Sequence, residues 1–279
     1  MAMRTLIILS LVLGCAAAFA GDRWNRVASP SPGLPQPIGS YAAGCLAGGV
    51  ALPLKGEGYQ VMRPSRNRYY GHPDLIAFVQ RLGRQAVKLK GRLLIGDLSQ
   101  PRGGPMVYGH NSHQIGLDVD IWFQQGPENR DLSSVETEQL PMISVVRVAE
   151  ASLAPAQWSP LYRDVLKRVA DDPLVDRVFI NPIIKQSLCR SESSRAWLRK
   201  IRPWWGHDAH FHIRLACPAG SALCQPQEPI PPGDGCDDNL NQWVWELQAE
   251  AKAPPKPKAT AARKTTSLPA ACQTVLGVD

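Results

Sequence analysis

In the middle of the chain, apolar and acidic side chains alternate along Gly116-Leu117-Asp118-Val119-Asp120-Ile121-Trp122-Phe123. Side chains two residues apart lie on the same face of a β-strand. The apolar residues are therefore expected on one face, and Asp118 and Asp120 on the other. The pattern predicts a strand with one face in the core and a second face that carries carboxylates.

A second expected strand, over residues 210–215, carries two histidines with the spacing of one face. His210 and His212 project together from such a strand, and Asp120 on the first strand could face them. His113 lies in the loop that leads into the first strand, and only His72 lies outside the two histidine clusters. Two imidazoles and one carboxylate are the ligand set of a catalytic zinc site that keeps a fourth position open for water.

Several of these residues have a second interpretation. An isolated His-x-His pair is often a surface feature, and its combination with the first cluster is what favours a metal. Asp118 is equally suited to holding a neighbouring group instead of the metal. We interpret His72 as a residue at the start of a helix and not as a metal ligand. The Trp204-Trp205 pair either belongs to the core or forms an aromatic rim for a peptide substrate.

The segments around these strands indicate the fold class. Short buried runs predict strands at 92–96 and 178–180, and residues 126–141 are interpreted as a polar insertion. Helical spacing of apolar residues predicts further helices from His72-Pro73-Asp74 to Gly91, over 161–169, from Asn181-Pro182 onward and over 195–202. Helices mixed with separated short strands predict an α+β fold, in which helices flank a central antiparallel sheet.

Residues 1–20 have the features of a secretory signal peptide. Arg4 gives a basic start, residues 6–13 an apolar core, and Ala18-Phe19-Ala20 a small-x-small cleavage pattern. The apolar run is too short to span a bilayer, and no later run is long enough, so no transmembrane segment is expected. The mature protein is therefore placed in the bacterial periplasm. The alternative is a lipoprotein in which Cys15 is lipidated and anchors the chain to a membrane.

Removal of Cys15 with the signal leaves six cysteines, at positions 45, 189, 217, 224, 236 and 272. An even number in an exported chain predicts three disulfides. The alternative is a cysteine metal site, but no Cys-x-x-Cys pair is present. Six cysteines allow fifteen pairings. Only Cys217 and Cys224 are suggested locally, because the turn Pro218-Ala219-Gly220 could bring them together.

The net charge indicates the class of partner, and the absence of known nucleophile motifs limits the possible catalytic mechanisms. The formal net charge of +7 favours anionic partners. An exported bacterial protein rarely meets nucleic acid, so cell-wall peptides with free carboxylates are the expected target and nucleic acid is not. The chain has no Ser-x-x-Lys, Gly-x-Ser-x-Gly or His-Glu-x-x-His motif, and its thiols are expected to be paired. Metal-activated water is the remaining nucleophile.

Seven stretches of the chain together resemble one known family: residues 58–63 (Gly-Tyr-Gln-Val-Met-Arg), 68–75, 94–97, 112–120, 197–200, 202–204 and 210–215. The family is penicillin-insensitive murein endopeptidase, part of a wider group of zinc peptidases. That group includes D-Ala-D-Ala carboxypeptidases, lysostaphin-like enzymes and hedgehog-like domains, and it implies a hedgehog/DD-peptidase-like fold. The resemblance runs along most of the chain after residue 20.

The implied site consists of the metal-site residues His113, Asp120, His212 and His110 and the catalytic residues His210 and His207. The first three match the family's zinc ligands, and His210 matches a histidine that assists catalysis. His110 and His207 match further histidines that line the same site. The implied cofactor is Zn²⁺. The implied activity is hydrolysis of the D-alanyl–diaminopimelyl amide that cross-links murein, with His210 handling a proton beside a zinc-activated water.

The resemblance also implies a disulfide pattern and a domain organisation. The implied pairs are Cys45–Cys272, Cys189–Cys236 and Cys217–Cys224. Residues 21–250 are then the zinc peptidase domain. Residues 251–279 are a Pro/Lys-rich C-terminal tail, extended over 252–258, which Cys272 tethers to the body.

The sequence departs from the wider group in three places. Asn111 stands where that group usually has Ser, and Asp118 where it favours Ala, although the endopeptidase branch shares this Asp. Members of the branch can carry an Asp and a His shortly before the Trp that matches Trp158. Here that stretch is Ala149-Glu150-Ala151-Ser152, which puts a second metal site in doubt.

Three other functions compete with the endopeptidase. A D,D-carboxypeptidase would need a group that clamps a terminal carboxylate, for which Arg102 or Arg202 could serve. A non-enzymatic periplasmic zinc carrier would use the same histidines, but such carriers typically have His-rich acidic loops and this chain has none. A wall-binding module with an inactive site disagrees with the intact ligand set.

Overall fold

The computed structural model describes residues 23–254 and 267–277. The expected signal peptide, the alternative lipidation site at Cys15 and residues 255–258 of the expected Pro/Lys stretch lie outside the described residues. Within the described ranges, no helix is long and apolar enough to cross a membrane.

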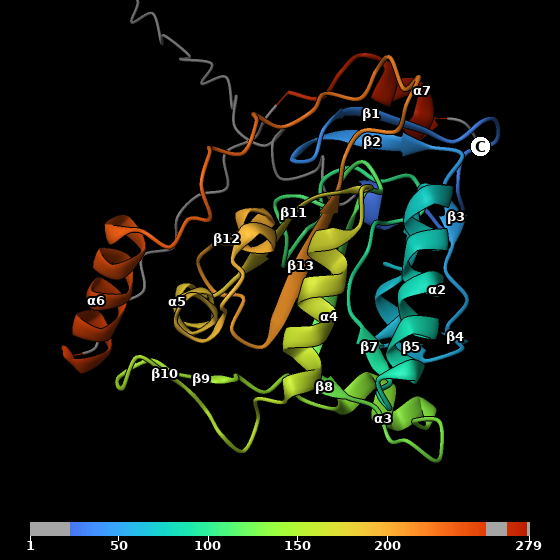
Figure 1. Ribbon diagram of the computed structural model, residues 1–279. Helices are drawn as coiled ribbons and strands as arrows, with labels where there is room; N and C mark the ends of the chain where they lie inside the picture. The colour runs from blue at the N-terminus through green and yellow to red at the C-terminus, as the bar shows by residue number, and fades with distance from the viewer. Residues whose placement is uncertain (1–22, 255–266, 278–279) are drawn as a thin grey trace, which may run out of the picture.

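A seven-stranded sheet in the order β12-β11-β13-β8-β7-β5-β4 forms the centre of the protein (Figure 1). Its strands are β4 (Lys55–Gly56), β5 (Tyr59–Val61), β7 (Leu93–Ile95), β8 (Asp118–Gln125), β11 (Val175–Ile180), β12 (Ile201–Pro203) and β13 (His210–Leu215). The fold is α+β, as predicted, but the expectation of a purely antiparallel sheet is wrong. β11 pairs parallel with β12, and β5 with β7. In both pairs a helix lies between the two strands in the chain, and such a crossover returns the chain in the same direction.

The two middle strands, β8 and β13, pair in an antiparallel register that separates an apolar face from a polar one. Val119 lies opposite Ile213, and Ile121 opposite Phe211, and all four belong to the main core. The acidic residues of β8 lie on the other face. The strand and the alternation predicted for residues 116–123 are therefore confirmed.

Three of the helices that contribute to that core are α2 (Pro73–Lys88), α4 (Pro160–Asp171) and α5 (Pro182–Ser191). Each begins with a side chain that accepts a hydrogen bond from the helix and is followed by proline, at His72-Pro73, Ser159-Pro160 and Asn181-Pro182. The cap satisfies an otherwise unpaired amide, and proline fixes φ for the first turn. The three helices were predicted, as was the role of His72 at a helix start.

The helix predicted over residues 195–202 is wrong. The segment forms a short 3₁₀ helix, η2 (Ala196–Lys200), and then enters β12 at the edge of the sheet. Trp197 and Leu198 are buried there, which satisfies the apolar spacing without an α-helix. Pairing with β11 supplies backbone hydrogen bonds that a helix would otherwise make, so tertiary context overrides the local pattern.

The remaining elements lie around the sheet. α3 (Ser134–Gln139) lies inside the predicted polar insertion and begins with a capping box between Ser133 and Glu136. α6 (Asp238–Lys252) was not predicted. The other elements are β1 (Gln36–Ser40), β2 (Ala43–Ala47), β3 (Val50–Ala51), β6 (Tyr70–Gly71), β9 (Val146–Arg147), β10 (Ser152–Leu153), η1 (Pro64–Arg66) and α7 (Ala271–Gly277).

The two ends of the described chain meet in a second, smaller core. Figure 1 shows α7 lying beside the hairpin of β1 and β2. Trp24, Ile38, Val275 and Leu276 are buried around the Cys45–Cys272 disulfide. The C-terminal helix is therefore held by apolar packing as well as by a covalent bond.

Three disulfides are present among residues 23–254 and 267–277, and they join the pairs that the family resemblance implies. Cys45 and Cys272 are 227 residues apart, whereas Cys217 and Cys224 are seven apart. The third bond, Cys189–Cys236, connects α5 to the segment that leads into α6.

We expect the bond at Cys45–Cys272 to stabilise the protein more than the bond at Cys217–Cys224. The chain-entropy relation gives about 5 kcal/mol for the long loop and about 2 kcal/mol for the short one. Replacing both cysteines of each pair with serine, followed by urea unfolding, measures the two losses. An equal loss in the two variants would contradict the loop-closure explanation.

Candidate metal centre and active site

The polar face of β8 and β13 carries a row of cross-strand pairs. Asp120 lies opposite His212, and on either side of this pair Asp118 lies opposite Arg214 and Trp122 opposite His210. Directly opposed side chains in an antiparallel pair are about 5 Å apart at Cβ, close enough for direct contact. The pairing of the two strands therefore brings together residues that are about ninety positions apart in the chain.

His113 reaches the same point from the loop before β8. Its backbone is in the left-handed region, with φ +66°, which is uncommon for a residue with a side chain. Two hydrogen bonds hold it there: its N–H donates to Asp118 Oδ2 at 2.9 Å, and its Nδ1 lies 2.9 Å from the carbonyl oxygen of Leu98. Because a carbonyl only accepts, the hydrogen-bond network places the ring proton on Nδ1, and the lone pair of Nε2 faces Asp120.

Three potential ligand atoms converge at the centre of this arrangement. His113 Nε2 is 3.4 Å from Asp120 Oδ1, His212 Nδ1 is 3.3 Å from the same oxygen, and the two nitrogens are 3.2 Å apart. A tetrahedral zinc with ligands at about 2.0–2.1 Å places its ligand atoms about 3.3 Å from one another. The three separations fit such an ion.

Asp120 Oδ1 supplies a second test of the fit. This oxygen is buried and accepts no hydrogen bond from any described residue. A buried carboxylate oxygen without a partner is costly unless a cation neutralises it. The residues present therefore fit a metal ion.

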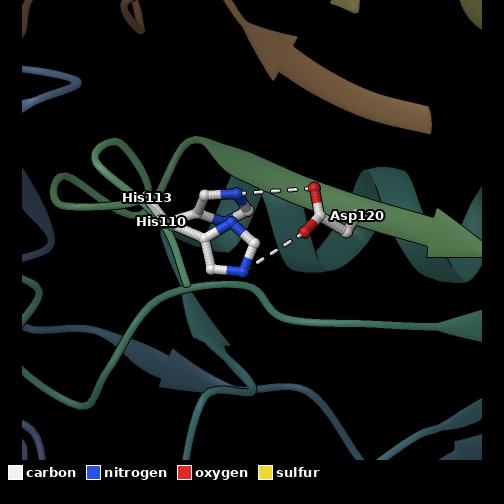
Figure 2. A group of neighbouring side chains, drawn as sticks. All are labelled: His110, His113 and Asp120. Atoms are coloured by element: carbon white, nitrogen blue, oxygen red, sulfur yellow. Dashed lines mark ion pairs between the residues drawn. The ribbon is translucent and has the colours of Figure 1, made fainter. Parts of the chain in front are cut away.

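The other oxygen of Asp120 faces a second pair of histidines. Figure 2 shows His113 and His110 approaching different oxygens of Asp120, and the His110 Nε2–Oδ2 distance is 3.5 Å. His210 Nε2 is 3.7 Å from the same Oδ2. His110, His113 and Asp120 also offer ligand atoms that all lie within 4.8 Å of one another, so this group too could hold a metal ion.

His207 completes the histidine cluster, beside Trp204 and Trp205. The His207 ring centre lies 5.0 Å from that of His210, and His207 Nδ1 lies 2.8 Å from the carbonyl oxygen of Trp205. Trp204 and Trp205 are 52% and 57% exposed, so they lie at the surface and not in the core. The structure thus brings all six predicted site histidines and carboxylates into one cluster, whereas His72 caps α2.

Burial and charge set the protonation of the cluster. Burial lowers the pKa of His113 to about 4, which leaves its ring neutral and able to bind a metal. Burial also lowers the pKa of His207 to about 4 and the pKa of His210 below its ordinary value. Burial alone would lower the pKa of His212 too, but the carboxylates of Asp118 and Asp120 outweigh it and raise that pKa.

Asp118 supports the centre without facing its ligand atoms directly. Its carboxylate accepts from Arg214 Nε at 2.8 Å and from the His113 N–H, and it lies 3.0 Å from His212 Nε2. His212 therefore turns Nε2 to one carboxylate and Nδ1 to Asp120. Carboxylates behind a ligand histidine fix its ring in this way. Of the two interpretations of Asp118, the structure favours the one in which it holds neighbouring groups.

The sequence is that of a known family. A family model described as penicillin-insensitive murein endopeptidase matches residues 37–277. The chain belongs to the penicillin-insensitive murein endopeptidase family. The enzyme of that name from Klebsiella pneumoniae (strain 342) is 45% identical over 276 residues, which cover 98% of this chain and 97% of the relative. Those from Escherichia coli O1:K1 / APEC and Haemophilus influenzae (strain ATCC 51907 / DSM 11121 / KW20 / Rd) are 44% and 42% identical, over 98% of this chain and 97% and 95% of theirs.

In this family member, Asp97 is a site residue whose role sequence reasoning missed. Its Oδ2 lies 3.1 Å from Arg66 Nη1, 2.9 Å from Arg68 Nη1 and 3.0 Å from His110 Nε2. Burial would raise the pKa of Asp97, but His110 and the two arginines outweigh it and hold that pKa at about 2. A signal existed, since Asp97 directly follows the strand predicted at 92–96, but nothing in the sequence shows which strand it adjoins.

A cleft opens on the Asp120 Oδ2 side of the centre. Its lining includes His110 and His210 from the cluster, and the side chains Met62, Arg63, Arg66, Asp97, Trp122 and Met142. Neither arginine proposed as a carboxylate clamp contributes to it. Arg102 instead donates to the carbonyl oxygens of Val275 and Leu276 at the end of α7. Arg202 lies on β12, where it is close to Gly235, so the structure places neither arginine at this cleft.

We expect Asp118→Asn to weaken both metal binding and stability. The substitution leaves Arg214 buried without its carboxylate, which typically costs 3–5 kcal/mol, and it loosens the His212 ring, which typically costs 10–100-fold in metal affinity. Calorimetric titration with Zn²⁺ and urea unfolding measure the two effects. Asp164→Asn is the matched control, because that carboxylate is 41% exposed and a surface pair is worth about 1 kcal/mol or less. Unchanged metal affinity in the Asp118 variant would contradict a supporting role.

Proposed function

We propose that the protein is a zinc-dependent murein endopeptidase that hydrolyses the D-alanyl–diaminopimelyl cross-link of peptidoglycan in the periplasm. Membership of the family and the name of its relatives support a peptidase that acts on murein. The observation that carries the zinc dependence is the convergence of three ligand atoms, one of them a buried carboxylate oxygen without a hydrogen bond.

His113, Asp120 and His212 are the proposed ligands, because their facing atoms are the closest three and each ring has a partner behind it. His110 is the alternative third ligand, but its Nε2 lies nearer to Asp97 than to Asp120. Bound there, zinc would supply Lewis acidity, lowering the pKa of a water molecule and polarising a peptide carbonyl.

His210 is the proposed proton-handling residue. It lies on the same strand face as His212, lines the cleft and is outside the closest set of three ligand atoms. Its lowered pKa leaves the ring neutral near pH 7, so it can take up a proton as an amide is cleaved and return it to the leaving amine. His207 is proposed to assist it: with its Nδ1 proton directed to the Trp205 carbonyl, its Nε2 is a second acceptor.

The surroundings favour an enzyme over a zinc carrier. A carrier needs its ligands but no substrate groove, whereas a cleft lined by His110 and His210 opens beside the three ligand atoms. Exposed Trp204 stacks edge-on against Phe179, whose ring lies against His212. This supports the interpretation of the tryptophans as an aromatic rim for substrate.

The ligand and catalytic roles predict different outcomes for different histidine variants. His113→Ala and His212→Ala should lose bound zinc and activity together. His110→Ala should keep zinc, and His210→Ala should keep zinc while turnover falls by roughly 10²–10⁴-fold. Zinc content by atomic emission and turnover are measured on the same preparations. Equal loss of zinc from the His210 variant would make that residue a ligand and reject this division.

The activity itself is tested with a cross-linked muropeptide dimer. Incubation with the mature chain, residues 21–279, should give monomers, stop with a chelator and resume when zinc is added, as followed by mass spectrometry. His113→Ala is the inactive control. Release of terminal D-alanine alone would identify a D,D-carboxypeptidase, and intact dimer with zinc bound would favour a carrier or a wall-binding module.

A further inference from the structure

The cleft beside the metal centre contains two arginines with different surroundings. Arg66 is committed to Asp97, at 3.1 Å, and that carboxylate is shared with Arg68 and His110. Arg63 also lines the cleft, but it forms no ion pair with any carboxylate among residues 23–254 and 267–277. The cleft thus has one guanidinium that has no ion-pair partner within these ranges and that Asp97 and Glu138 stabilise only through longer-range attraction.

The position of Arg63 is fixed by its backbone and by an aromatic ring. Its φ of +53° lies in the left-handed region, and its N–H donates to the Thr137 carbonyl oxygen at 2.8 Å. A backbone conformation that is rare for residues with side chains persists only where the surroundings enforce it. The guanidinium carbon lies 5.3 Å from the ring centre of Trp122, which is opposite His210 on the neighbouring strand. A cation stacked on an aromatic face loses little freedom and keeps its N–H groups available.

The electrostatic setting of Arg63 favours an anionic ligand. Partial burial and the nearby charge of Arg66 outweigh the attraction of Asp97 and Glu138 and lower the pKa of Arg63 below its ordinary value. The charged form is therefore less well stabilised than it would be in water. A carboxylate entering the cleft would restore that stabilisation and could accept two parallel hydrogen bonds from the planar guanidinium.

We propose that Arg63 binds the substrate carboxylate that is attached to the same carbon as the scissile amide nitrogen. The assignment rests on the proposed function. In a D-alanyl–diaminopimelyl cross-link, the nitrogen that becomes the leaving amine is bonded to a carbon bearing a free carboxylate. An arginine that shares the cleft with the proton-handling His210 can hold this group while the amide is cleaved. The same clamp would serve a terminal carboxylate, so Arg63 takes the role that sequence reasoning gave to Arg102 or Arg202.

The proposal predicts that Arg63 recognises one chemical group, the substrate carboxylate beside the scissile amide nitrogen. Two substrates test it: the cross-linked dimer, and the same dimer with that carboxylate converted to a primary carboxamide. For the unmodified enzyme we expect amidation to lower kcat/KM by roughly 10–100-fold, as for loss of a charge-assisted hydrogen bond. Arg63→Gln should lose a similar factor on the free acid and should discriminate acid from amide by less than about threefold. Arg63→Lys keeps the charge and should retain part of the discrimination.

Arg84→Gln is the matched control, because it removes the same charge from an exposed position on α2. It should behave like the unmodified enzyme, and melting temperature and zinc content are compared for all variants. If Arg63→Gln keeps the full ratio of kcat/KM between the free-acid and the carboxamide dimer, the proposal is wrong, whatever the overall rate of the variant. Equilibrium binding of the two dimers to chelator-treated protein gives the same ratio without turnover. If the protein never cleaves the dimer, the proposed function is wrong. The ratio of its affinities for the free-acid and amidated dimers then still tests the role of Arg63.

Discussion

The pairing of β8 with β13 is the constraint on which the site depends. It places Asp120 opposite His212 on one face and Ile121 opposite Phe211 on the other. Because side chains alternate, a slip of one residue would move the carboxylates into the core and the apolar residues into the cleft. The buried apolar pairs therefore fix the register, and the register in turn positions the ligand atoms. Core packing and the geometry of the candidate metal site are two consequences of a single strand alignment.

Around this pair, two buried carboxylates organise the residues that come from elsewhere in the chain. Asp118 joins Arg214, His212 and the backbone of His113, while Asp97 joins Arg66, Arg68 and His110. Each carboxylate is nearly inaccessible and surrounded by donors, as buried charges require. These supporting residues hold the histidines in orientations that the histidines alone would not keep. Arg63 differs from the other arginines of this region in having no such partner, which suits it to a ligand.

The alternation at residues 116–123, the His-x-His pair and the helix-starting prolines are local patterns, and each correctly predicted its element. They work because strand and helix periodicity and capping act over a few residues. The convergence of His113, Asp120 and His212 was also foreseeable, since strand geometry limits where their side chains point. The resemblance to the family added the disulfide pairs, which spacing alone left open.

Other features depended on contacts between distant segments. Local apolar spacing suggested a helix at residues 195–202, but an open sheet edge beside β11 made a strand more favourable. The order of the strands in the sheet likewise decides three features. These are the two parallel strand pairs, the ion pairs that Asp97 forms with Arg66, Arg68 and His110, and the absence, among the described residues, of an ion-pair partner for Arg63. The sequence by itself determined the local elements and the chemistry of the histidine cluster. Only the tertiary structure decided which charges are matched and which is left for a ligand, because ion pairs form between groups that the fold brings together.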